Sequence, residues 1–355
     1  MQGGVWMEKE ETLRRLEYDL LRILACIMVV MLHVSAFYWT KLSPQTTDWK
    51  VLNFYDSIVR SCVPLFFMIS GVFMLHQEMS LTKLWRKHIL HLVLVWMIWS
   101  VLYGIDTLGF SGFFHSGTGK IFTAVVNGKY HLWFLPAMIG VYILAPFLYG
   151  LIRLNKEKWI QYGIALFFLF GVVRSTLTVY PYSNSSIFDF INKMPDFRNY
   201  AGYFLLGYAL EYLFHKKVKT FWLMLGYIFT AGAAVGISQV DSIAKGTPTG
   251  LMFGYFCLPV FVEAVCIFLI FKNMGDKLHI RSQTGEKMIC LLSKCTMGVY
   301  LLHPFVLERL DRLHINALMG NPVLFVPLVT VLTVGICGAI NFVLLQVPIV
   351  KKYLF

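Results

Sequence analysis

The chain has 355 residues, of which 57% are hydrophobic, 16% aromatic and only 14% charged. Soluble domains carry about 25% charged residues, so this composition excludes an ordinary soluble protein and indicates a membrane protein. The formal net charge of +12 comes largely from Lys and Arg residues in short segments between apolar runs, so we assign it to membrane topology and expect no nucleic-acid partner.

Apolar runs follow one another along the chain, and most are long enough for the roughly 20 helical residues that cross about 30 Å of hydrocarbon. They predict an all-α fold, a polytopic transmembrane helical bundle of about ten spans that forms a single domain over residues 1–355. The longer segments near 110–129 and 180–197 are expected to be loops on the outer side. The expected spans are residues 18–38, 51–75, 88–109, 131–150, 159–179, 199–214, 220–238, 251–271, 289–308 and 323–347.

Lys and Arg residues are divided unevenly between alternate loops. The segment before the first span and those after each even-numbered span hold roughly twice as many as the other loops, an excess that is typical of cytoplasmic loops. We therefore expect both termini in the cytoplasm and a multi-pass protein of the cytoplasmic (inner) membrane, with membrane lipids around it. The seven Cys residues lie in or beside apolar segments without metal-ligand spacing, so we expect neither disulfides nor a metal site.

The first span carries ionisable residues that should lie on one face. His33 follows Arg22 by eleven positions, which is about three helical turns plus 20° and a rise of about 16 Å. A neutral imidazole suits removal of a proton from an alcohol, and a guanidinium can hold a phosphate or a developing oxyanion. In the structural alternative, Asp19 and Arg22 lie at the membrane interface and His33 bonds a neighbouring helix.

Two further ionisable residues lie inside predicted spans. Arg60 can pair with Asp56 one turn earlier, which suits a structural ion pair as well as a functional one. Glu263 lies near the middle of its span with no charge at helical spacing, so we expect it to pair with another helix, at Arg60 or Arg174.

Five segments together resemble the membrane acyltransferase family 3. Leu20-Leu21-Arg22 with His33 eleven positions on is similar to the Arg-x10-His signature of that family's first helix. The other four match in the same order along nearly the whole chain: VPLFFMISG at 63–71, HLWFLP at 131–136, YFLLG at 203–207 and YLLHP at 300–304. The basic cluster Arg86-Lys87-His88 departs from the family's paired-arginine pattern.

The resemblance implies an acyl-CoA-dependent membrane O-acyltransferase, similar to the stand-alone surface-glycan O-acetyltransferases. It would move an acetyl group from cytoplasmic acetyl-CoA to a hydroxyl of a cell-surface carbohydrate or of its lipid-linked precursor, directly or through an acyl-enzyme. His33 would be the general base and Arg22 the second catalytic residue. The residues expected near the donor are Arg86, Lys87, His88 and Ser70. Those expected near the acceptor are Trp133, His303, Glu263 and Arg60.

Structural readings stay open for several of these residues. Ser70 with Gly71 suits close helix packing, Trp133 suits interfacial anchoring, and the basic cluster suits topology alone. His303 precedes Pro304, so it can mark a local break whose freed carbonyl needs a donor.

Two other classes of function remain as alternatives. A secondary transporter for a small polar solute would also place ionisable residues inside spans, but no internal repeat is visible and the ordered segments disfavour it. A sensor or assembly partner without chemistry would have no use for a polar stripe on the first helix.

Overall fold

The computed structural model describes residues 15–154, 157–179, 185–275, 278 and 282–347, and in these ranges every regular element is a helix. The elements, two of them π-helical (η), are α1 (Leu16–Trp39), α2 (Thr47–Ile58), α3 (Cys62–His76), α4 (Leu81–Lys83), η1 (Leu84–Ile89), α5 (Leu90–Leu108), α6 (Phe110–His115), α7 (Thr118–Asn127), α8 (Phe134–Arg153), α9 (Glu157–Leu166), η2 (Phe167–Val173), α10 (Arg174–Val179), α11 (Ser185–Lys193), α12 (Tyr200–Tyr212), α13 (Thr220–Lys245), α14 (Leu258–Gly275), α15 (Gln283–Arg312) and α16 (Pro322–Leu344).

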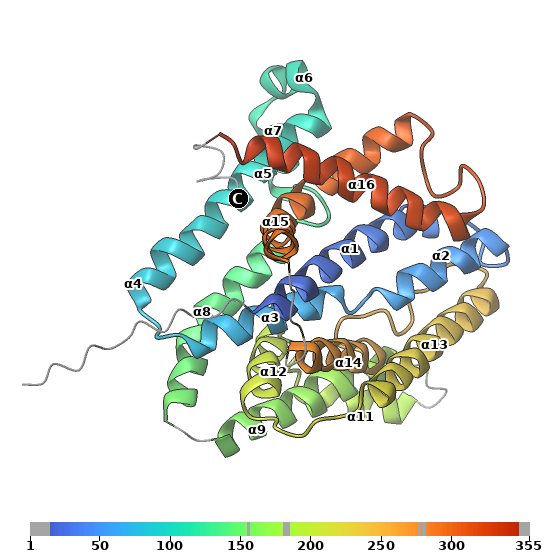
Figure 1. Ribbon diagram of the computed structural model, residues 1–355. Coiled ribbons are helices and arrows are strands. Elements are labelled where there is room, and N and C mark those ends of the chain that lie inside the picture. Colours follow the sequence, from blue (N-terminus) through green and yellow to red (C-terminus); the bar gives the residue numbers. More distant parts are fainter. Residues whose placement is uncertain (1–14, 155–156, 180–184, 276–277, 279–281, 348–355) are drawn as a thin grey trace, which may run out of the picture.

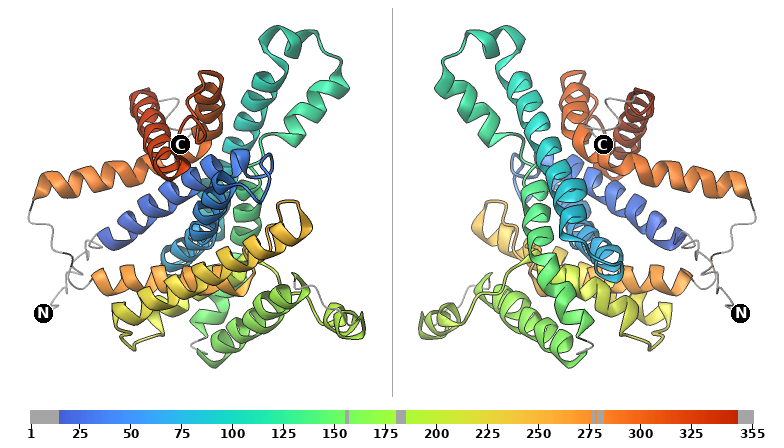
Figure 2. Two further views of the ribbon diagram at one scale, coloured as in Figure 1. Left: turned by 90° about the vertical axis from the view of Figure 1, so that its right-hand side faces the viewer. Right: turned by 90° about the vertical axis from the view of Figure 1, so that its left-hand side faces the viewer.

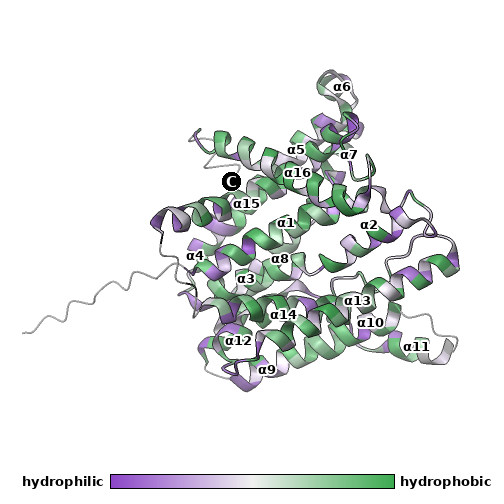
Figure 3. Ribbon diagram, turned by 45° about the vertical axis from the view of Figure 1, so that its right-hand side comes forward, coloured by the Kyte–Doolittle hydropathy of each residue, from purple (hydrophilic) through white to green (hydrophobic). Residues whose placement is uncertain are grey.

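Nine helical runs in the described ranges are long and apolar enough to cross a membrane. Figure 3 shows hydrophobic residues along most helices and hydrophilic residues more often toward their ends and in the connections. The predicted all-α polytopic bundle is therefore confirmed. The nine runs are α1, α2–α3, α4–η1–α5, α8, α9–η2–α10, α13, α14, α15 and α16.

The one predicted span that is not among these nine runs, 199–214, is the short helix α12. Its 13 residues rise only about 20 Å, less than the thickness of a bilayer core. It nevertheless runs between the two ends of the bundle. Near its first end the ring of Tyr200 lies 5.6 Å from that of Trp133, and near its last end Glu211 pairs with Arg15, just before α1, at 2.7 Å. Surrounding helices bury most of α12, so it does not need the length of a lipid-facing span.

Three predicted features differ in detail. The second span is two helices, α2 and α3, with a break at residues 59–61. The predicted loop near 110–129 contains α6 and α7, which project from the bundle in both views of Figure 2. The predicted loop near 180–197 contains α11, and its residues 180–184 lie outside the described part.

Helix α1 lies in the middle of the bundle, between α15 and α16 on one side and α3 and α14 on the other (Figure 1). It begins at the end of the bundle where α16 finishes. The Ser293 hydroxyl of α15 donates to Asp19 in the first turn of α1, and Asn341 near the end of α16 donates to the nearby Cys295 carbonyl of α15. This arrangement agrees with the expectation of termini on one side, although the terminal residues themselves lie outside the described part.

Two glycines allow α3 and α12 to touch along their backbones. A Cβ on Gly71 would overlap the carbonyl oxygen of Phe204, and a Cβ on Gly207 would overlap that of Met68. Close approach of this kind is the usual role of small residues between membrane helices. Gly71 and Gly207 therefore have a packing role. The sequence motifs that contain them did not by themselves distinguish packing from a role in substrate binding.

We expect Gly71→Ala and Gly207→Ala each to destabilise the protein by about 1–3 kcal/mol or more, because the added methyl group meets backbone that cannot rotate away. Thermal unfolding in detergent, followed by size-exclusion chromatography, measures the loss. The matched control is Gly140→Ala in α8, where a Cβ meets nothing within 4 Å. Equal melting temperatures for all three variants would contradict the packing role.

Candidate active site

A cavity of about 230 Å³ lies beside α1. Its wall comes from α1, α3, α5, α8 and α15, from the segment just before α8 and from the loop before α14, and it is mostly apolar and aromatic. The lining residues with polar side chains are Arg22, His33, Ser70, His131, Trp133, Tyr142, Tyr255, Thr296 and Tyr300.

Arg22 and His33 both border this cavity, as their spacing on one face of α1 predicts. Neither turns away to lipid. They lie about 16 Å apart along the helix, so the cavity extends from the end of the bundle where α1 begins toward its other end. Ser70, which was expected near the donor, is also part of the wall.

At the end of the cavity where α1 begins, here called the inner end, Asp19 and Ser293 hold the guanidinium of Arg22. Its Nη1 lies 3.3 Å from Asp19 Oδ1 and donates to Ser293 Oγ at 3.1 Å. The Ser293 hydroxyl in turn donates to Asp19 at 2.6 Å. The guanidinium is thereby oriented by groups from two helices while about a third of its side-chain surface stays exposed.

Near the other end, three histidines from separate parts of the chain meet. His33 Nδ1 lies 3.0 Å from His303 Nε2 and 2.9 Å from the carbonyl oxygen of Val29. The ring of His131 lies 5.2 Å from that of His303, and its two nitrogens have no hydrogen-bond partner in the described part of the chain. His33 and His131 face the cavity, whereas His303 is fully buried and is not part of the wall.

Aromatic side chains form the outer part of the wall. The rings of Trp133 and Tyr255 lie 5.6 Å apart and nearly parallel, at 29°, and Trp133 remains 38% exposed. An exposed aromatic face beside the cavity is a surface on which a flat or ring-shaped substrate can stack.

Of the basic cluster in η1, only His88 approaches the cavity. Its half-buried ring lies 6.1 Å from that of Tyr142, which lines the wall. Arg86 and Lys87 are exposed and are not lining residues. They lie near the start of their span, toward the inner end where Arg22 is placed. A π-helical turn widens the backbone at this point, a feature found frequently at functional sites.

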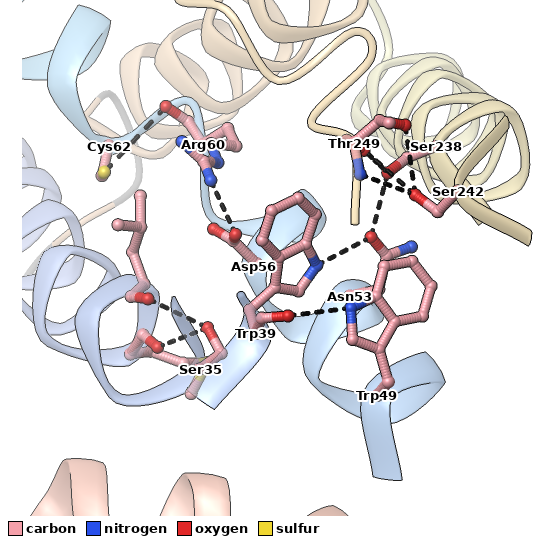
Figure 4. A network of polar contacts seen from close by, with 12 residues as sticks. Ser35, Trp39, Trp49, Asn53, Asp56, Arg60, Cys62, Ser238, Ser242 and Thr249 are labelled. Atoms are coloured by element: carbon pink, nitrogen blue, oxygen red, sulfur yellow. Dashed lines mark hydrogen bonds and ion pairs between the residues drawn. The ribbon is translucent and has the colours of Figure 1, made fainter. Parts of the chain in front are cut away.

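Arg60 belongs to a buried polar network outside the cavity (Figure 4). Its Nη2 donates to Asp56 at 2.6 Å, which is the ion pair that the spacing predicted. In the same network Asn53 Oδ1 accepts from Trp39 of α1 and from Ser238 of α13. These contacts connect α1, α2 and α13.

Glu263 does not have the partner expected from the sequence. It is fully buried, and neither carboxyl oxygen has a hydrogen-bond partner among the described residues. The expectation is wrong because both candidate arginines are engaged elsewhere: Arg60 within its own network, and Arg174 with Asp196 at 3.0 Å. Hydrogen bonds from Arg198 lower the pKa of that Asp196 carboxyl to about 2. Glu263 is also not a lining residue of the cavity.

Sequence reasoning missed several lining residues, notably His131 as a member of the histidine group, Tyr255 and Tyr300. The available signals were the motif-like segments 131–136, which contains His131, and 300–304, which contains Tyr300; Tyr255 had none. Within the described residues, no three His, Cys, Asp or Glu side chains are arranged to hold a metal ion, and this includes the three histidines.

A family model described as an acyltransferase domain, Acyl_transf_3, matches residues 15–342. The chain belongs to this acyltransferase family. Comparison with curated proteins gives no match, and comparison with solved structures gives none. The matched range contains α1 through most of α16, so the cavity with its histidines lies inside the family domain of a multi-pass membrane acyltransferase.

We expect Met138→Trp to abolish acyl transfer, because Met138 lines the cavity and an indole would fill much of its volume. The matched control is Ile143→Trp, five residues along the same helix at a position that is 44% exposed. Both variants should keep a melting temperature within a few degrees of wild type. Wild-type turnover by Met138→Trp would show that the reaction takes place elsewhere.

Proposed function

We propose that the protein is an O-acetyltransferase that moves an acetyl group from cytoplasmic acetyl-CoA to a hydroxyl of a cell-surface carbohydrate or of its lipid-linked precursor. The main observation behind this proposal is that Arg22 and His33 border the same cavity, one at each end. The donor is a cytoplasmic metabolite, so the protein would lie in the cytoplasmic (inner) membrane.

The donor enters at the inner end, where Arg22, Arg86, Lys87 and His88 can meet its phosphates. Charge-assisted bonds from Arg and Lys to phosphate oxygens are among the stronger ones in proteins. Because Arg22 and His33 are about 16 Å apart, Arg22 cannot contact the reacting carbonyl held beside His33. In this proposal Arg22 binds the donor rather than taking part in the bond-making step.

His33 acts as the general base. It takes the proton of the acceptor hydroxyl as the hydroxyl oxygen attacks the thioester carbonyl. The carbon–sulfur bond then breaks, and the proton passes from His33 to the departing thiolate, so that the products are the acetyl ester and free CoA thiol. A positioned base of this kind contributes about 10²–10⁴-fold to the rate.

The acceptor approaches from the aromatic outer part of the wall. The exposed face of Trp133, stacked on Tyr255, suits one face of a sugar ring. His131, which lines the cavity with both ring nitrogens unpartnered in the described part of the chain, offers hydrogen bonds to the acceptor or to the thioester carbonyl. Arg60, Glu263 and His303 are not lining residues, and the proposal does not use them as direct acceptor contacts.

The purified protein in lipid should release free thiol from acetyl-CoA when it is given surface-glycan acceptors, and His33→Gln should lower kcat by about 10²–10⁴-fold. His115→Gln, at an exposed histidine outside the cavity, is the control and should retain wild-type turnover. Full activity of the His33 variant would remove the general base from the proposal.

Arg22→Gln should raise the KM for acetyl-CoA by about tenfold or more with a smaller effect on kcat, since a lost charge-assisted bond is worth roughly 1.5–3 kcal/mol. Initial rates over a range of acetyl-CoA concentrations measure both constants. Arg153→Gln, at an exposed arginine at the inner end of α8, should leave both unchanged. An effect of Arg22→Gln on kcat alone would argue against a donor-binding role.

A further inference from the structure

A proline in α15 frees a backbone carbonyl beside the histidines. In an α-helix the N–H of residue i donates to the carbonyl of residue i−4, and Pro304 has no N–H to give to Tyr300. The side chain of His303 replaces the missing donor, because its Nδ1 lies 2.7 Å from the Tyr300 carbonyl oxygen. Helix α15 continues through this position without a break, but the freed carbonyl anticipated from the His-Pro pair has a donor, which is the histidine itself.

The freed carbonyl decides which nitrogen of His303 carries the proton. A carbonyl oxygen only accepts hydrogen bonds, so Nδ1 of His303 must be the donor. In the neutral ring Nε2 is then an acceptor with a free lone pair. That acceptor lies 3.0 Å from Nδ1 of His33.

The same reasoning carries over to His33. Its Nδ1 is within hydrogen-bonding distance of two acceptors, His303 Nε2 and the Val29 carbonyl at 2.9 Å. Because both of these neighbours can only accept a hydrogen bond here, Nδ1 of His33 must carry the proton. The lone pair of the neutral ring is then on Nε2, because both of these hydrogen bonds are made at Nδ1, and the ring lines the cavity.

We propose that His303 is a positioning residue that holds His33 in the tautomer with its proton on Nδ1, so that Nε2 faces the cavity as the base. This inference rests on the proposed function for the meaning of the base, but the tautomer itself follows from the hydrogen bonds. His303 does not contact substrate, because it is fully buried and both of its ring nitrogens are occupied.

The contact also supports the charged form of His33 during the reaction. When Nε2 takes the acceptor's proton, the ring becomes an imidazolium and the Nδ1–H bond to His303 becomes charge-assisted, which makes it shorter and stronger. His303 keeps its own proton on Nδ1 throughout, because the Tyr300 carbonyl remains in place. Pro304 thus influences the protonation of His33 through two successive hydrogen bonds, from His303 to the Tyr300 carbonyl and from His33 to His303.

Two substitutions separate this role from simple packing. His303→Gln can place its amide oxygen where Nε2 stands and continue to accept from His33, whereas His303→Leu fills similar space without an acceptor. We expect His303→Leu to lower kcat at least about tenfold, a part of the roughly 10²–10⁴-fold that a general base contributes. The KM for acetyl-CoA should change little in both variants, and His303→Gln should retain most of the activity. Equal losses in the two variants, or wild-type kcat for His303→Leu, would overturn the proposal.

A spectroscopic readout does not depend on turnover. In ¹⁵N-histidine-labelled protein in lipid, protonated and unprotonated ring nitrogens have well-separated chemical shifts, and the His33 signals are those lost in His33→Gln. We expect the proton on Nδ1 of His33 in the wild type. In His303→Leu the Val29 carbonyl is the remaining acceptor, so we expect a larger share of His33 protonated on Nε2 than in the wild type. A wild-type His33 protonated on Nε2 would refute the inference even if the enzyme transfers acetyl groups. Absence of thiol release with the proton on Nδ1 would instead refute the proposed function alone.

Discussion

The polar pairing of α1 with α15 is the interaction on which the rest of the structure depends. Hydrogen bonds join the two helices at four depths, and such bonds between membrane helices are worth roughly 0.6–2 kcal/mol each. They fix the register of α1 against α15, and therefore the height and direction of every side chain on the α1 face that borders the cavity. From the inner to the outer end the pairs are Ser293–Asp19, Thr296–Cys26, His303–His33 and Asp311–Tyr38.

Around this pair, close and loose packing are distributed unequally. Helices α3 and α12 meet backbone to backbone at their two glycines, and the Asn53 network ties α2 to α1 and α13. The cavity lies next to this tightly packed part, and its wall includes α3 itself together with α1, α5, α8 and α15. The close packing of α3 against α12 therefore keeps one part of the cavity wall in a defined place.

The histidine group shows how a membrane interior can hold a base in one protonation pattern without a carboxylate partner. The proline-freed carbonyl, the buried ring of His303 and the ring of His33 form a chain in which each acceptor determines the next donor. In low-dielectric surroundings each of these bonds is more directional and more costly to break than in water. This suits the role proposed for His33, in which Nε2 presents a lone pair to the acceptor hydroxyl while the rest of the ring stays ordered.

Much of the fold and part of the site could be predicted from the sequence, because the bilayer imposes length and apolarity on spans and because a helix places residues eleven apart on one face. Those two constraints are local, so they determined the helical bundle, most of the spans, the pairing of Arg60 with Asp56 and the common face of Arg22 and His33. The tertiary structure alone decided which distant segments meet: the approach of His131 and His303 to His33, the place of Tyr255 in the wall, the lack of a hydrogen bond from either arginine to Glu263 among the described residues, and the shortness of α12. These depend on helix packing between segments up to 270 residues apart, and no spacing along a single helix contains that information.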